Sequence, residues 1–271
     1  MNTDKLTKDS LRRYIPNVVA EVDGEAPLFD KLAPFIDSAK ARLEAEYLGT
    51  DDFLREQHNE LALKVLVASA FAEAVPSLDL ILTPSGFGVV STEAVAPASK
   101  ERVERLISSL RDYADANLAL LVDICRTYPQ WRDSERGRWF GASLFPSLED
   151  YNRLFRKSFT SYAEMREAVI KVESRLAERY LGRPLLAELR YQALLGNYES
   201  YSPVAVARSA VWSVLHAREK AADPNLLWHA AARVIEAVKY DCDLYELWHE
   251  EMGALFESPG FKNNINGGFY F

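Results

Sequence analysis

The side chains with the greatest chemical potential in this sequence are its four histidines. They are His58, His216, His229 and His249. Zinc ligands recur at close spacings, such as two histidines four residues apart on one helix face, and no two of these histidines stand in that relation. The run His249-Glu250-Glu251-Met252 begins like a zinc-protease motif but has no second histidine. We therefore expect no metal site, and we interpret the histidines as helix-surface residues beside aromatic core.

Adjacent carboxylates are frequent, and they are the next candidates for chemistry. Examples are Asp51-Asp52, Glu149-Asp150 and Glu250-Glu251. General acid–base catalysis needs two carboxylates that face each other in a shielded pocket and titrate at different pH values. Neighbouring residues on a helix point in different directions, so such pairs normally form solvated surface. We expect no catalytic carboxylate pair.

Patterns for nucleophiles and nucleotides are also missing. The sequence has no G-x-S-x-G elbow and no G-x-x-x-x-G-K-[ST] loop, and Gly86-Phe87-Gly88 is not followed directly by a helix that would receive a dinucleotide. Cys125 and Cys242 lie within apolar helical patterns, which is typical of small buried side chains in a reducing compartment. The sequence predicts a protein that is not an enzyme, with no catalytic residue, cofactor or metal.

The composition and net charge of the chain indicate which class of partner it binds. The chain has 271 residues, 48% of them hydrophobic, and a formal net charge of −8. A nucleic-acid binder needs a concentrated basic face, so this balance favours protein partners. Residues 1–13 are polar and charged, unlike a signal peptide, and the longest apolar run, 61–75, is interrupted and shorter than the ~20 residues of a membrane span. We expect an intracellular soluble protein without a membrane partner.

Periodicity predicts a mainly all-α fold. Apolar residues recur at three- and four-residue steps in a series of segments, many of them bounded by proline or glycine. The predicted helices span about 27–48, 59–75, 97–127, 147–158, 161–181, 184–195, 203–219 and 226–257. The one β signal is a pair of short strands, 78–82 and 87–90, around the turn residues 83–86.

Two halves of the chain resemble each other. Residues 42–49 (RLEAEYLG) match residues 175–182 (RLAERYLG) at an offset of 133, and Arg105-Leu106-Ile107 matches Arg233-Val234-Ile235 at an offset of 128. Two anchors in the same order around a similar apolar helix predict two diverged copies of one helical-bundle unit. The predicted organisation is an N-terminal arm (1–26), a first repeat with the hairpin near 78–90 (27–127), a linker (128–146), a second repeat (147–257) and an aromatic C-terminal tail (258–271).

The hairpin is the first candidate for partner binding. An isolated two-stranded ribbon is marginally stable in water, so it must either cap its own helices or pair with another chain. The second copy has Lys220-Ala221-Ala222-Asp223-Pro224 at the corresponding place. The residues predicted to make the contact are those of the tip, Pro84, Ser85, Gly86 and Phe87.

The tail is the second candidate. It carries Phe261, then a polar run, the pair Gly267-Gly268, and finally Phe269, Tyr270 and Phe271. Each aromatic ring can bury on the order of 150 Å² or more. The rings could dock on the chain's own core or on a partner subunit, and we favour the partner because chain ends fray unless something holds them.

Three runs of residues resemble a known family. They are Tyr128-Pro129-Gln130-Trp131-Arg132-Asp133-Ser134, Asp150-Tyr151-Asn152, and Val172-Glu173 through Tyr180-Leu181-Gly182, and Thr83-Pro84-Ser85-Gly86 resembles the ribbon turn of the same family. The family consists of duplicated all-helical proteins of Bacteroidetes and their phages and prophages, and much of it has no known function. The resemblance extends over roughly residues 27–257.

This resemblance implies a virion structural role, as a head–tail connector (adaptor) subunit that docks on the portal ring. The implied partners are the portal protein, neighbouring copies in a ring, and other tail or connector proteins. The implied location is the cytoplasm during assembly and then the neck of the virion. Two alternatives remain open: a soluble monomeric or dimeric helical protein-binding module, and a helical enzyme with a pocket between the copies.

Overall fold

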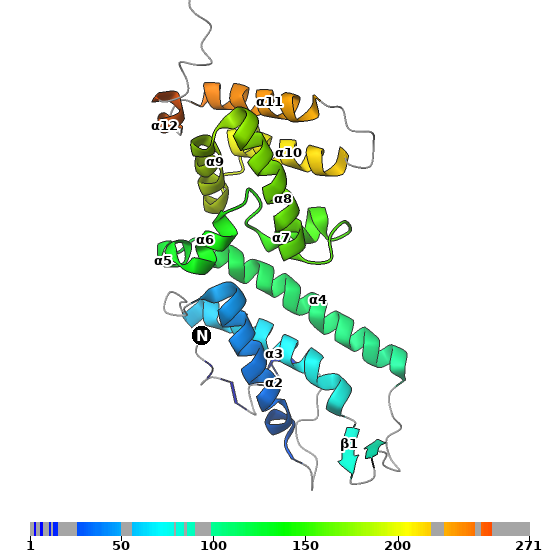
Figure 1. The fold of residues 1–271 in the computed structure, drawn as a ribbon. Coiled ribbons are helices and arrows are strands. Elements are labelled where there is room, and N and C mark those ends of the chain that lie inside the picture. The colour runs from blue at the N-terminus through cyan, green and yellow to red at the C-terminus, as the bar shows by residue number, and fades with distance from the viewer. Residues whose placement is uncertain are drawn as a thin grey trace, which may run out of the picture. The chain divides into compact units, whose positions relative to one another are not determined.

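A computed structural model confirms the predicted fold class: the described part of the chain is mainly α-helical (Figure 1). The structure describes residues 3, 6–7, 11, 13–15, 26–49, 56–78, 80–83, 86–89, 99–217, 225–241 and 245–250. The chain forms two compact units. Unit 1 comprises Met1–Phe140 and Ser147–Tyr162, and unit 2 comprises Gly141–Pro146 and Ala163–Phe271.

Unit 1 is built around one apolar helix. α3 (Glu56–Leu78) packs against α2 (Leu28–Leu43) on one side and against the long α4 (Lys100–Cys125) on the other (Figure 1). A helix that is apolar on most of its circumference belongs in a core. The buried side chains of α3 are Ala62, Leu63, Val65, Leu66, Val67, Ala68, Ala70, Phe71, Ala72 and Ala74.

The apolar character of α3 also makes it the one helix, among the described residues, that is long and apolar enough to cross a membrane. The qualifying segment is His58–Leu78, and 56% of its most apolar window is buried inside the protein. The core helix of a soluble protein passes the same test. α3 also runs through Pro76, whereas the sequence predicts its end at Val75; a proline in the last turn removes only one hydrogen bond from the helix.

Two short strands follow α3. β1 (Leu80–Thr83) pairs antiparallel with β2 (Gly86–Val89), with Leu80 opposite Val89 and Thr83 opposite Gly86. The two residues of the tip between the strands lie outside the part of the chain that the structure describes.

The two matching octapeptides share a local backbone geometry. In each, an α-helix ends in a π-helical turn: α2 continues into η1 (Glu44–Leu48), and α8 (Tyr162–Leu176) continues into η3 (Ala177–Leu181). The amide of Gly49 bonds the Glu44 carbonyl at 2.8 Å, and that of Gly182 bonds the Ala177 carbonyl at 2.9 Å. Both glycines have positive φ, 77° and 79°, which only glycine adopts without steric cost.

Residues 128–146, predicted to be a linker, instead contribute to both cores. α5 (Pro129–Asp133) and α6 (Glu135–Gly141) place Trp131 at 0% exposure, and its indole Nε1 donates to the Tyr47 carbonyl at 2.9 Å. A Cβ on Gly137 would lie 1.9 Å from the Trp131 carbonyl oxygen. Gly137 therefore permits close helix contact, and Pro129 occupies the first turn of α5, where proline is favoured. Proline and glycine are frequent in linkers, and their presence led to the prediction of a linker here; in the structure they serve helix initiation and close packing instead.

Phe140 lies at the centre of an aromatic cluster in unit 1. Its ring stands 5.6 Å from that of Trp131, 5.0 Å from Trp139, 5.3 Å from Tyr162 and 6.4 Å from Tyr47, measured between ring centroids. Phe140 itself is fully buried. Tilted and offset ring pairs at these distances are mutually attractive, so the cluster joins η1 to α5 and α6.

Residues 147–162 also differ from the predicted organisation, because they belong to unit 1 rather than to the second repeat. α7 (Leu148–Asp150) and η2 (Tyr151–Phe155) pack beside α4. The Ser147 hydroxyl donates to Asp123 at 3.2 Å, and Arg156 pairs with Asp112 at 3.1 Å. These contacts, together with burial of Phe155, hold the segment on α4.

Unit 2 contains the remaining helices. They are α8, α9 (Arg183–Leu195), α10 (Pro203–His216), α11 (Leu226–Tyr240) and the short α12 (Glu246–Trp248). α11 packs along α10 and contacts η3, while α9 contacts η3, α10 and α12. The predicted helix 226–257 is interrupted, because Asp241 leaves the helical conformation at φ −108° and ψ 74°.

A buried carboxylate anchors residues Gly141–Pro146, the segment of unit 2 that lies between α6 and α7. Glu173 on α8 is 0% exposed and accepts bonds from Nε and Nη2 of Arg190 at 2.9 and 2.6 Å, and from the Leu144 amide at 2.8 Å. Burial raises the pKa of Glu173, while Arg190 and these hydrogen bonds act in the opposite direction. A buried charge is tolerated only with such a complete set of partners.

Arg208 on α10 completes the attachment. Its guanidinium lies 4.5 Å from the ring centroid of Phe145 and 4.1 Å from that of Tyr198, and it donates to the Leu144 carbonyl at 3.0 Å. Residues Gly141–Pro146 are thus held by Glu173 of α8 and Arg208 of α10, while Arg190 of α9 holds Glu173.

Replacing Glu173 should destabilise unit 2. Glu173→Ala leaves the Arg190 guanidinium, itself largely buried, and the Leu144 amide without their acceptor, and we expect a loss of about 3–5 kcal/mol in the free energy of unfolding. Glu167→Ala, at an exposed position of the same helix, is the matched control and should change it by less than ~0.5 kcal/mol. Urea unfolding followed by circular dichroism measures both; equal midpoints would show that the buried pair is dispensable.

Cys125 should be chemically inert in the folded protein. The side chain is 0% exposed, and burial raises the pKa of its thiol to about 12. The thiolate is the reactive species, so a disulfide reagent at pH 8 should label Cys125 only after unfolding in urea. The Cys242→Ser variant isolates the signal from Cys125, and rapid labelling of this variant without urea would contradict the prediction.

Candidate interaction surface

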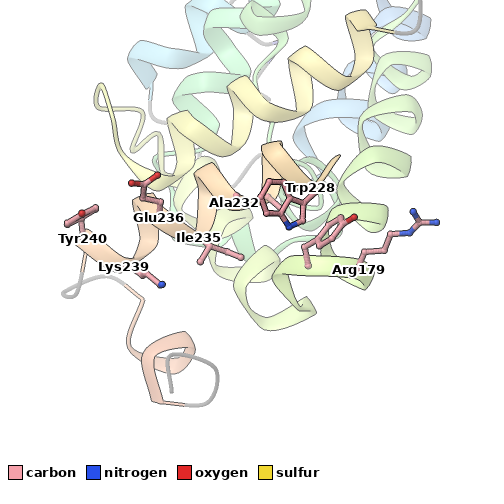
Figure 2. Close-up of a pocket in the computed structure, with 9 residues that line it drawn as sticks. Arg179, Trp228, Ala232, Ile235, Glu236, Lys239 and Tyr240 are labelled. Carbon is pink, nitrogen blue, oxygen red and sulfur yellow. The ribbon is translucent and has the colours of Figure 1, made fainter. Parts of the chain in front are cut away.

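Unit 2 has an open groove between η3 and α11, with a volume of about 750 Å³ (Figure 2). Its α11 residues recur at three- and four-residue steps and therefore lie on one face of the helix. The groove is lined by Arg179, Tyr180, Trp228, Ala231, Ala232, Ile235, Glu236, Lys239 and Tyr240. Figure 2 shows Arg179 and Trp228 at one end of this row and Lys239 and Tyr240 at the other.

The lining combines aromatic walls with small residues. Trp228 is 54% exposed and Tyr240 84% exposed, while Ala231 is buried beneath them. Large aromatic side chains left in water on one helix face are typical of surfaces that another molecule covers. Tryptophan, tyrosine and arginine are also the residues that dominate binding energy at protein interfaces. The groove therefore has the composition of a protein-binding site.

The charges around the groove are mixed. Arg179 and Lys239 are basic and exposed, and Glu236 is acidic and exposed. A guanidinium or ammonium group beside a groove can lie over the face of an incoming aromatic ring. This arrangement suits an uncharged, aromatic segment better than a strongly acidic or basic one.

A second groove lies on the other side of α11. It has a volume of about 580 Å³ and is lined by Tyr201, Ala205, Val206, Ser209, Arg233, Glu236, Ala237 and Tyr240. Because it shares Glu236 and Tyr240 with the first groove, the exposed side of α11 forms one continuous surface. Tyr201 is 91% exposed and its φ is +71°, a conformation that is uncommon for a residue other than glycine.

The corresponding region of unit 1 differs in character. A cavity of about 280 Å³ there adjoins η1, α2, α3 and α4, and its mouth carries Arg42, which forms an ion pair with Glu73. Burial raises the pKa of Tyr47 to about 12, so its hydroxyl stays protonated. At the positions 128 residues before Trp228 and Ala232, α4 has Lys100 and Glu104, an exposed ion pair at 3.7 Å. At these two positions unit 1 thus has a solvated ion pair where unit 2 has Trp228 and Ala232.

The structure describes two of the eight contact residues that the sequence predicts. Gly86 and Phe87 lie in β2, opposite Thr83 and Leu82. The other predicted residues, Pro84, Ser85, Phe261, Phe269, Tyr270 and Phe271, lie outside the described part of the chain. Their role in partner binding stays a prediction.

The groove residues were not identified from the sequence, although a signal exists. α11 buries the stripe Ala230, Val234 and Val238, and a second set of apolar and aromatic residues, Trp228, Ala232 and Ile235, lies beside it. A helix with more apolar surface than one core stripe needs is a candidate for a second interface.

The described histidines make structural contacts. The His58 Nδ1 lies 2.6 Å from the Tyr128 hydroxyl, and the His216 ring stacks on Trp212 with 4.0 Å between centroids. Among the residues with described positions, no group of three or more histidine, cysteine, aspartate or glutamate side chains is arranged to hold a metal ion.

Residues 19–141 match the model of a family of unknown function (DUF6712). The matched region contains the first predicted repeat together with α5 and α6, including the run 128–134. Comparisons with curated proteins and with solved structures found no match.

Exposure of the groove can be tested through its tryptophan. Trp228→Phe removes the most exposed tryptophan among the described residues, so in a chain shortened to residues 1–258, which has no tail, acrylamide should quench the remaining tryptophan emission less strongly than when Trp228 is present. Trp248→Phe, which removes a tryptophan that is 1% exposed, should have the opposite effect. A quenching constant that is unchanged by Trp228→Phe would mean that the groove is covered in solution.

Proposed function

We propose that this protein is a structural subunit that assembles through protein–protein contacts, specifically a phage or prophage head–tail connector (adaptor) that forms a ring and docks on a portal protein. The observation that supports an assembly role is the exposed aromatic groove on α11, with Trp228 and Tyr240. The phage setting rests on the resemblance of residues 128–134 and 172–182 to the duplicated helical family. Residues 19–141 match the DUF6712 family, which has no assigned function, so this match is compatible with the phage setting.

The mechanism we propose is mechanical rather than chemical. A ring forms when each copy offers one surface to a different surface of the next copy and the rotation closes. A stable contact of this kind buries well over ~1,000 Å² and is anchored by a few aromatic side chains. In this proposal the helical units are the body of the ring, and the hairpin (78–90) and the tail (258–271) extend onto neighbouring copies or the portal.

Duplication of one helical unit is part of the same proposal. The order α2, η1, α3, α4 in unit 1 parallels the order α8, η3, α10, α11 in unit 2, with α9 inserted after η3. The shared π turn and positive-φ glycine at Gly49 and Gly182 support this interpretation. The hairpin between α3 and α4 supports a specialised role for the first copy, since the residues 220–224 of the second copy lack its apolar pattern.

A second candidate is a monomeric or dimeric helical module that binds a protein partner through the same groove. It uses the same aromatic surface but needs no ring. The two candidates differ in the mass of the particle in solution and in their response to a portal protein.

Removal of residues 259–271 tests the connector proposal. We expect the unaltered protein to form a ring, alone or on addition of a phage portal protein, and the truncated protein to stay monomeric with an unchanged helical circular-dichroism spectrum. Mass photometry measures both. Lys262→Ala, which keeps every aromatic of the tail, is the matched control and should assemble normally. Ring formation by the truncated protein would refute the role of the tail, and an unaltered chain that stays monomeric with the portal would favour the module.

A further inference from the structure

The groove on α11 and the aromatic tail have matching chemistry. We propose that the groove between η3 and α11 of one copy is the docking site for the tail residues Phe269, Tyr270 and Phe271 of a neighbouring copy. This inference rests on the proposed ring, because the tail must come from a second copy of the chain.

The size and shape of the groove suit aromatic rings. Its volume, about 750 Å³, falls in the range of about 300–1,000 Å³ that is usual for pockets enclosing a compact ligand. Because the side chains of Ala231 and Ala232 are small, space remains between the flanking rings of Tyr180 and Trp228. Aromatic rings inserted there can make edge-to-face or offset contacts with both walls.

The charge pattern is also complementary. Residues 263–271 carry no charged side chain, so their burial leaves no unpaired side-chain charge in the interface. Arg179 and Lys239 lie at opposite ends of the groove, where each can meet the face of a tail ring. The asparagines 263, 264 and 266 can provide hydrogen bonds at the polar rim.

The length of the tail allows it to reach another copy. Phe269 follows the last described residue, Glu250, by 19 residues (269 − 250), which span up to about 60 Å when extended. Gly267-Gly268 lets the chain turn just before the rings. A tail placed in the groove of the next copy is a head-to-tail contact, and repetition of such a contact generates a ring when the rotation between copies closes.

A complementation experiment tests this arrangement. The groove variant is Ala232→Arg, which fills the groove from an exposed helix position with a residue that favours helix. The tail variant combines Phe269→Ser, Tyr270→Ser and Phe271→Ser in the full chain. We expect each variant alone to be monomeric and their mixture to form a one-to-one complex, since only one compatible tail–groove pair remains. Tyr191→Ala, an exposed aromatic on α9 outside the groove, is the control and should assemble like the unaltered chain.

The outcomes separate this inference from the proposed function. If the unaltered chain forms rings and the mixed variants stay monomeric, the tail–groove contact is refuted and the connector proposal stands. If the unaltered chain stays monomeric even with the portal protein, the proposed function fails, and a synthetic peptide of residues 257–271 then tests the groove on the tail variant. We expect Ala232→Arg, introduced into the tail variant, to weaken peptide binding at least tenfold.

Two further outcomes would overturn the assignment. Absence of peptide binding to the tail variant would show that the groove does not recognise the tail. Peptide binding to the tail variant but not to a monomeric unaltered chain would show that the tail occupies the groove of its own chain. Trp228→Ala, checked by circular dichroism, provides a second groove variant if Ala232→Arg does not fold.

Discussion

The geometry of unit 2 depends on one buried carboxylate. The Glu173 carboxylate is buried away from solvent. α8 can therefore keep its packed position only while Arg190 of α9 and the amide of Leu144 bond that carboxylate. Arg208 adds α10 to the same loop through the Leu144 carbonyl. Since α8 continues directly into η3, the wall of the groove formed by Tyr180 is positioned by the same set of bonds.

The π turn that precedes Gly49 in unit 1 and Gly182 in unit 2 has different surroundings in the two units. In unit 1, the Tyr47 carbonyl at the end of the π turn accepts the indole N–H of Trp131, which satisfies one of the carbonyls left over at a helix C-terminus. That contact covers η1 with α5 and α6. In unit 2, the equivalent tyrosine, Tyr180, lines an open groove. The motif therefore borders a cavity of about 280 Å³ in unit 1, where Tyr47 lines it, and a larger groove of about 750 Å³ in unit 2.

The exposed surface of α11 is the reason why we propose that the protein acts by binding other proteins. Its buried side chains are Ala230, Ala231, Val234 and Val238. Trp228 and Tyr240 add apolar surface that the fold does not use, and exposed rings of this size favour association over solubility. On α4 the positions that correspond to Trp228 and Ala232 hold the ion pair Lys100–Glu104, so these two groove residues have no counterpart in unit 1.

The sequence by itself determined the all-α class and the main helix boundaries, because the apolar period of a helix is a local property. It also predicted the helix ends at Gly49 and Gly182, since glycine alone readily adopts positive φ. Only the tertiary structure decided that 128–146 is core, because Pro129 and Gly137 look like linker residues until Trp131 is seen buried beneath them. The surplus apolar residues of α11 are visible in the sequence, but only the tertiary structure decided that they form a groove, because its walls come from Tyr180 and from α11, about fifty residues apart, and exposure is a result of packing rather than of residue type.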